Sequence, residues 1–157
     1  GGPSGTESNE AFRVWQHLNN AGMIETKVSG IAGSGGVNHA VPTATATDAQ
    51  NVPGSKYVQA SGFTLYYKTG GAGFFSGIAY DHILNFGMAT AADVTDGALL
   101  SASDAQSIDL KVDDGKPGTG SVLVYNTAAC VESASVYDVT NQSTTTPVCN
   151  MVFITGF

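Results

Sequence analysis

Three aspartates in the second half of the chain have the residue type and spacing that could bind a metal ion. Asp109 and Asp113 are four positions apart, and Asp114, Gly115 and Pro117 follow in the stretch SIDLKVDDGKPGTG. Carboxylates gathered at one turn are ligands that Ca²⁺ prefers. The D-x-D-x-D-G spacing of an EF-hand is absent, so we expect no metal here and keep Asp109, Asp113 and Asp114 as candidate Ca²⁺ ligands only.

The same residues can instead end a helix. Like charges near the negative end of a helix cost roughly 0.2–0.5 kcal/mol per pair, and something must offset that cost. Asp113 or Asp114 would do so by accepting hydrogen bonds from N–H groups of the turn, while Gly115 takes a left-handed conformation and Pro117 prevents further helix. The sequence therefore predicts a structural turn at Asp113, Asp114, Gly115 and Pro117.

Asp81 beside His82 is a possible acid and base pair. A catalytic dyad also needs a nucleophile and an oxyanion site, and the sequence does not place either of them. We therefore predict a structural role for this pair, no cofactor and no enzymatic activity.

Cys130 and Cys149 are the two cysteines of the chain. A disulfide is the preferred interpretation, because no histidine lies at ligand spacing from either cysteine; two buried free thiols are the alternative. A bond closing a loop of this size stabilises a fold by about 3 kcal/mol. It would also imply an oxidising compartment.

Two amphipathic helices are expected. The first lies in ESNEAFRVWQHLNNAGMI, with Ser8 as N-cap and Gly22 as a left-handed stop. Its apolar stripe has helical spacing and consists of Ala11, Phe12, Trp15, Leu18 and Ala21, of which Phe12, Trp15 and Leu18 are the predicted core residues.

The second helix lies in SASDAQSIDLKV and begins at Ser103, which forms a capping-box pattern with Gln106. Ala105, Ile108 and Val112 would share the face that docks on the core.

Strands are expected in SGFTLYYK, in FFSGIAYDHILNFGM with turns or bulges at Gly77 and Gly87, in SVLVYN and in NMVFITGF. Residues 29–55, which include His39, read as a long loop. Together these elements predict an α+β fold with an antiparallel sheet.

Length and charge limit the classes of function. A chain of 157 residues suits a single folded unit spanning 1–157. The formal net charge is -7, and no stretch concentrates lysine or arginine, so neither nucleic acid nor an anionic membrane surface is an expected partner. Charged residues make up only 12% of the chain, about half the usual fraction, which predicts a neutral polar surface.

Three features together resemble the globular region of type IV pilin-like proteins, in the sub-group of prepilin-type cleavage/methylation-domain proteins. EAFRVWQHLNNAGMI is similar to the helix of that family, which has an acidic start, a Trp-Gln-His-Leu segment and Ala-Gly before an apolar residue. ALLSASDAQSIDLKVDDGKPGTGSV is similar to its Ile-Asp-x-Lys and Asp-Asp-Gly-x-Pro segment, and Cys130 and Cys149 are placed like its C-terminal disulfide-bounded loop.

The resemblance implies a pilin-like α+β ectodomain in the periplasm or on an extracellular filament of a bacterium. Its function would be that of a structural subunit, either a pilin, a minor pilin or a type II secretion pseudopilin, with other pilin subunits as partners in a homo- or heteropolymeric filament. Family members also carry a leader and a long apolar helix that anchors them in the inner membrane. We expect that this membrane-spanning helix was removed from the chain or is supplied by a separate one.

An extracellular carbohydrate- or surface-binding module is the alternative function. Four tyrosines, Tyr57, Tyr66, Tyr67 and Tyr80, could stack on sugar rings.

Overall fold

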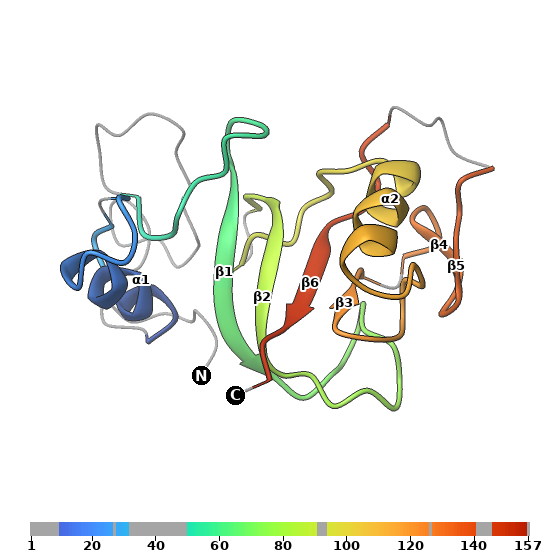
Figure 1. The fold of residues 1–157 in the computed structure, drawn as a ribbon, viewed down its shortest axis with the longest axis horizontal. Coiled ribbons are helices and arrows are strands. Elements are labelled where there is room, and N and C mark those ends of the chain that lie inside the picture. The colour runs from blue at the N-terminus through green and yellow to red at the C-terminus, as the bar shows by residue number, and fades with distance from the viewer. Residues whose placement is uncertain are drawn as a thin grey trace. The chain divides into compact units, whose positions relative to one another are not determined.

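The protein has an α+β fold, seen in a computed structural model that describes residues 10–26, 28–31, 50–90, 94–125, 127–140 and 146–156 (Figure 1). The helices are α1 (Glu10–Asn20) and α2 (Ala102–Val112). The strands are β1 (Ser61–Lys68), β2 (Asp81–Met88), β3 (Val122–Leu123), β4 (Val131–Ser133), β5 (Val136–Tyr137) and β6 (Met151–Ile154). The predicted class is confirmed, whereas Ser8, His39 and most of the expected loop 29–55 lie outside the described residues.

The strands form an antiparallel sheet and a separate hairpin. The four-stranded sheet has the order β1-β2-β6-β3, and β3 pairs with β6 in the register Val122 to Phe153 and Leu123 to Val152. Strands β4 and β5 pair antiparallel as a two-stranded sheet, with an irregular register between Val131 and Ser133.

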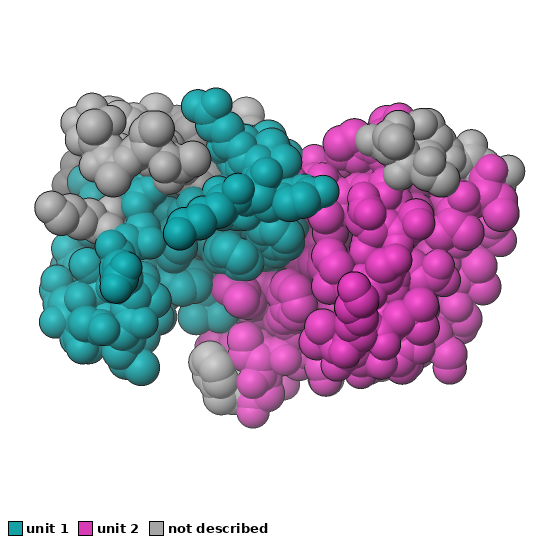
Figure 2. All heavy atoms as spheres, turned by 45° about the horizontal axis from the view of Figure 1, so that its top comes forward, with its two compact units in different colours: residues 1–67, 85–97 teal, residues 68–84, 98–157 magenta. Residues whose placement is uncertain are grey.

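The chain divides into two compact units (Figure 2). Unit 1 comprises residues 1–67 and 85–97, and unit 2 comprises residues 68–84 and 98–157. Strand β2 thus contributes its first half to unit 2 and its second half to unit 1.

Helix α1 belongs to unit 1 and buries part of the predicted stripe. Phe12 is fully buried and Trp15 is nearly so, as expected for large apolar side chains at helical spacing. Leu18 is only partly buried and lines a surface hollow together with Val14 and Ala21. Gly22 has φ 70°, the left-handed conformation predicted for the helix stop.

Strand β1 buries a mixed polar and aromatic face in unit 1. Thr64 is fully buried and Tyr66 nearly so, whereas Tyr67 is exposed. The Thr64 hydroxyl lies 2.6 Å from the hydroxyl of Thr95 and also accepts the Thr95 N–H at 2.9 Å. These bonds make it possible to bury two hydroxyl groups inside the unit, because each polar group keeps a partner.

Unit 2 is assembled around β6, β3 and aromatic side chains of the segment that precedes β2. Tyr80 is buried, and its hydroxyl accepts the Phe75 N–H at 2.8 Å. Gly77 has φ 81° in the turn between these residues, as the sequence suggested, whereas Gly87 lies inside β2.

Helix α2 begins two residues earlier than predicted and buries a different face. Its N-cap is Ser101, not Ser103, because the Ser101 hydroxyl accepts the Asp104 N–H at 3.0 Å and donates to the Asp104 carboxylate at 2.8 Å. The buried residues of the helix are Ala102, Ala105 and Asp109, while Val112 is 65% exposed. The expectation that Val112 docks on the core is therefore wrong; the buried stripe at this end of the helix runs through Asp109.

Replacement of Ala60 by glycine should stabilise the protein. Ala60 has φ 63°, a left-handed conformation that costs a residue with a Cβ atom about 1–2 kcal/mol. Because glycine is also more flexible in the unfolded chain, the net gain for Ala60→Gly should be about 0.5–1 kcal/mol in denaturant unfolding. Ala72→Gly, in an exposed loop position without positive φ, should instead lower stability, and equal effects at both positions would contradict this explanation.

Candidate functional site at the end of helix α2

Asp109 is a fully buried carboxylate in the last turn of α2. Its Oδ2 accepts a hydrogen bond from the Tyr137 hydroxyl at 2.8 Å, and its Oδ1 accepts the Gly115 N–H at 3.2 Å. A buried carboxylate is tolerated only when its oxygens are hydrogen-bonded. The two bonds therefore join the helix to the following turn and to strand β5.

The next two aspartates accept hydrogen bonds from the loop that follows α2. Asp113 Oδ2 accepts the N–H groups of Ser121 and Val122, the latter at 2.8 Å. Asp114 accepts the Lys116 N–H at 2.9 Å and a bond from the Thr119 hydroxyl. These are the kind of turn hydrogen bonds that the sequence predicted for Asp113 and Asp114.

Gly115 and Pro117 complete the turn. Gly115 has φ 73°, and a Cβ atom there would collide with the Leu110 side chain. Pro117 is buried, and its carbonyl oxygen accepts the Val124 N–H at 3.1 Å. The chain can thus reverse tightly beneath Leu110 because residue 115 has no side chain.

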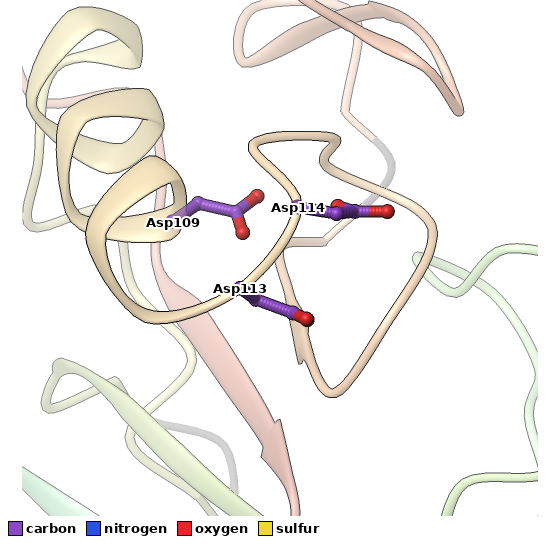
Figure 3. A group of neighbouring side chains, drawn as sticks. All are labelled: Asp109, Asp113 and Asp114. Carbon is purple, nitrogen blue, oxygen red and sulfur yellow. The ribbon is translucent and has the colours of Figure 1, made fainter.

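The three aspartates are close enough to hold a cation. One oxygen from each of Asp109, Asp113 and Asp114 lies within 4.8 Å of the others, and the side chains extend toward the loop that follows α2 (Figure 3). At least five of their six carboxylate oxygens already accept hydrogen bonds from N–H and hydroxyl groups of the protein. The hydrogen bonds therefore account for the positions of these carboxylates without a metal ion.

The electrostatic environment differs between Asp109 and Asp114. Burial raises the pKa of Asp109, and the neighbouring Asp114 and Asp113 raise it further, although its hydrogen bonds oppose the change. The exposed Asp114 has a lowered pKa, chiefly because the Thr119 hydroxyl bonds to its ionised form. Burial also raises the pKa of Tyr137, and its bond to Asp109 adds to that effect, so the tyrosine acts as a hydrogen-bond donor.

A disulfide joins Cys130 and Cys149, with 5.1 Å between their Cα atoms, as the sequence predicted. Both cysteines are buried. The bond closes a segment that contains the β4–β5 hairpin and therefore Tyr137. Asp109 and the disulfide consequently belong to one connected part of unit 2.

Asp81 and His82, and the four tyrosines proposed to bind sugars, do not form a hydrogen-bonded cluster like that of the three aspartates. Asp81 is exposed with φ 49°, and the backbone oxygen of His82 accepts two hydrogen bonds from Thr155, so this pair is engaged at a strand start. Among the four tyrosines proposed to stack on sugars, Tyr66 and Tyr80 are buried, which removes them as stacking surfaces, while Tyr57 and Tyr67 are exposed.

Sequence reasoning missed Tyr137 as the partner of Asp109. The two residues are 28 positions apart, and a tyrosine within SVYDV carries no local signal that distinguishes a buried donor from an ordinary strand residue. The signal that was present is the 102, 105, 109 spacing of α2, which places Asp109 on the same face as two alanines.

Comparison with family models, with curated proteins and with solved structures found no match to this chain. Within the described residues, neither helix has the length and apolar character needed to cross a bilayer.

Gly115→Ala should destabilise the protein by about 1–2 kcal/mol or more, because the residue has positive φ and its new methyl group would press on Leu110. Gly77→Ala is the matched control, since Gly77 has φ 81° with no atom within 4 Å of an added Cβ. Chemical denaturation should show a larger loss at Gly115, and an equal loss would mean that the contact with Leu110 is unimportant.

The two perturbed aspartates should affect the pH dependence of stability with opposite signs. Because the pKa of Asp109 is raised on folding, its contribution favours the folded state at low pH and is lost as pH rises from about 4 through the folded pKa. Because the pKa of Asp114 is lowered, its contribution is present above about 4 and is lost as pH falls through the folded pKa.

Unfolding free energies of the wild type, Asp109→Asn and Asp114→Asn, measured across this acidic range, test these signs. The wild-type advantage over Asp109→Asn should shrink as pH rises, and its advantage over Asp114→Asn should grow. Parallel curves for the two variants would show that the environments of the carboxylates are not different.

Proposed function

We propose that this protein is a structural subunit of a type IV pilus-like or type II secretion filament, as a pilin, minor pilin or pseudopilin. The observation that carries the proposal is where the family-like segments lie in the fold. The Trp15 segment forms α1, the Asp-Asp-Gly-x-Pro segment forms the end of α2 and its turn, and the two cysteines form a disulfide after them.

The chemistry of the acidic turn supports a structural role. The carboxylates of Asp109, Asp113 and Asp114 are held by N–H and hydroxyl groups from their own unit, so their hydrogen bonds shape the loop. A catalytic carboxylate must also face a substrate and a reacting partner group. Asp109 is fully buried, which suits an internal anchor better than a group that meets a substrate.

The disulfide supports placement outside the cytoplasm. Such bonds form and persist in oxidising compartments, among them the bacterial periplasm and the cell exterior. We therefore place the subunit in the periplasm or on an extracellular filament of a bacterium, with other pilin subunits as its partners. Contact with the inner membrane would come only through an apolar N-terminal helix of the kind that the resembling family carries.

The carbohydrate- or surface-binding alternative is weaker. Of the four tyrosines on which it rests, only Tyr57 and Tyr67 are exposed, at 58% and 46%. Both belong to unit 1, and neither lines the hollow beside α1 that Val14, Leu18 and Ala21 help to form. A sugar site would need such rings beside convergent polar groups.

The isolated 157-residue domain should be monomeric at micromolar concentration in sedimentation experiments. The filament proposal assigns most of the assembly energy to an apolar helix, and an ectodomain contact below about 1,000 Å² does not give a stable association. In its own cells, the full-length protein should fractionate with the membrane and with filaments sheared from the surface.

A periplasmic marker protein that stays with the cells is the control for lysis in that fractionation. Stable oligomers of the isolated domain would contradict the proposal. A second contradicting result has two parts. The sheared filaments would lack the protein, and neither its gene nor the gene of a partner would encode an apolar helix.

A further inference from the structure

The Cys130–Cys149 disulfide is connected to Tyr137 by a short path inside unit 2. Asp138 directly follows Tyr137, and its N–H donates to the Cys130 carbonyl oxygen at 2.9 Å. Val131, directly after Cys130, pairs with Tyr137 across the β4–β5 hairpin. Cys130 and its neighbour Val131 therefore hold the backbone at Tyr137 in place.

Cys149 is connected in the same way to the start of α2. The Leu100 N–H donates to the Cys149 carbonyl oxygen at 2.9 Å, and the Cys149 N–H donates to the Leu100 carbonyl oxygen at 2.9 Å. Leu100 directly precedes Ser101, the N-cap of α2. One cysteine thus holds the first turn of the helix, while the other holds the tyrosine that bonds to its last turn.

We propose that the disulfide and the Tyr137–Asp109 hydrogen bond form one redox-sensitive latch, in which reduction of the disulfide releases the acidic turn after α2. This inference does not depend on the filament proposal. The reductant is a dithiol: one of its thiolates attacks one cysteine sulfur, the Cys130–Cys149 bond breaks, and the other cysteine leaves as a thiolate while a mixed disulfide forms. The second thiolate of the reductant then attacks the reductant's own sulfur in the mixed disulfide and releases the remaining cysteine as a thiolate. Two electrons and two protons pass to Cys130 and Cys149, and the dithiol becomes a disulfide.

Release of the turn follows from the entropy of the opened segment. The two cysteines are 19 positions apart, and without the covalent bond the β4–β5 segment gains the conformational freedom that the closed loop denies it. Tyr137 then leaves Asp109 more often, and water reaches a carboxylate that is fully buried in the oxidised protein. The Gly115 N–H loses its acceptor when Asp109 turns toward that water.

At equilibrium the coupling also acts in the reverse direction, because the linkage between the free energies of two contacts is reciprocal. Removal of the Tyr137 hydroxyl should make the disulfide easier to reduce. Both sulfur atoms belong to buried residues, so attack requires the hairpin to open first, and the Tyr137–Asp109 bond opposes that opening.

The rate of disulfide reduction by dithiothreitol in the folded, oxidised protein tests this. Tyr137→Phe should be reduced at least about tenfold faster than the wild type, as expected for loss of a hydrogen bond to a charged group. Tyr80→Phe is the matched control, because Tyr80 is equally buried in unit 2 and its hydroxyl bonds to Phe75. Equal acceleration in both variants, or none in Tyr137→Phe, would overturn the latch.

Amide hydrogen exchange in the oxidised and reduced wild type gives a second, independent readout. The Gly115 N–H should lose protection on reduction, while the Thr155 N–H, which donates to His82 in the sheet, should keep most of its protection. Equal loss at both amides would mean that the disulfide stabilises the whole unit and operates no local latch. Unchanged protection at Gly115 would overturn the proposal as well.

Discussion

The buried carboxylate of Asp109 is the constraint on which unit 2 depends. Removing a charged group from water is costly, and the fold can accept it only where donors reach both oxygens. The Gly115 N–H and the Tyr137 hydroxyl are those donors. Helix end, turn and hairpin must therefore form together, since each supplies a part that the others need.

Asp113 and Asp114, which are less buried than Asp109, are likewise held by hydrogen bonds from the loop that follows α2. Asp113 accepts a hydrogen bond from the backbone N–H of Val122, where β3 begins. Asp114 accepts one from the Thr119 hydroxyl, five residues further along the chain. Because backbone N–H groups satisfy acidic side chains here, a run of adjacent negative charges becomes a means of shaping a loop.

The features of the fold that depend on short segments of sequence could be predicted. Phe12 and Trp15 at helical spacing predicted α1, and Gly115 before Pro117 predicted the turn. Both predictions were possible because periodicity and backbone preference are properties of short segments. The start of α2 differs from the prediction because Ser101 and Ser103 both suit a cap, and the observed cap, Ser101, directly follows Leu100, which is bonded to Cys149 far along the sequence. The spacing of α2 places Asp109 on the face of Ala102 and Ala105, but its partner could not be predicted because Tyr137 comes from a strand that is distant in the sequence.

Strand β6 follows all the other described strands in the sequence, yet it lies between β2 and β3 in the sheet. During synthesis, β2 and β3 each leave an unpaired edge until residues 151–154 emerge from the ribosome. Such edges are templates for pairing with other chains. In a growing chain, the exposure of these two edges therefore ends only when β6 has been made, and chaperone protection matters most in that interval.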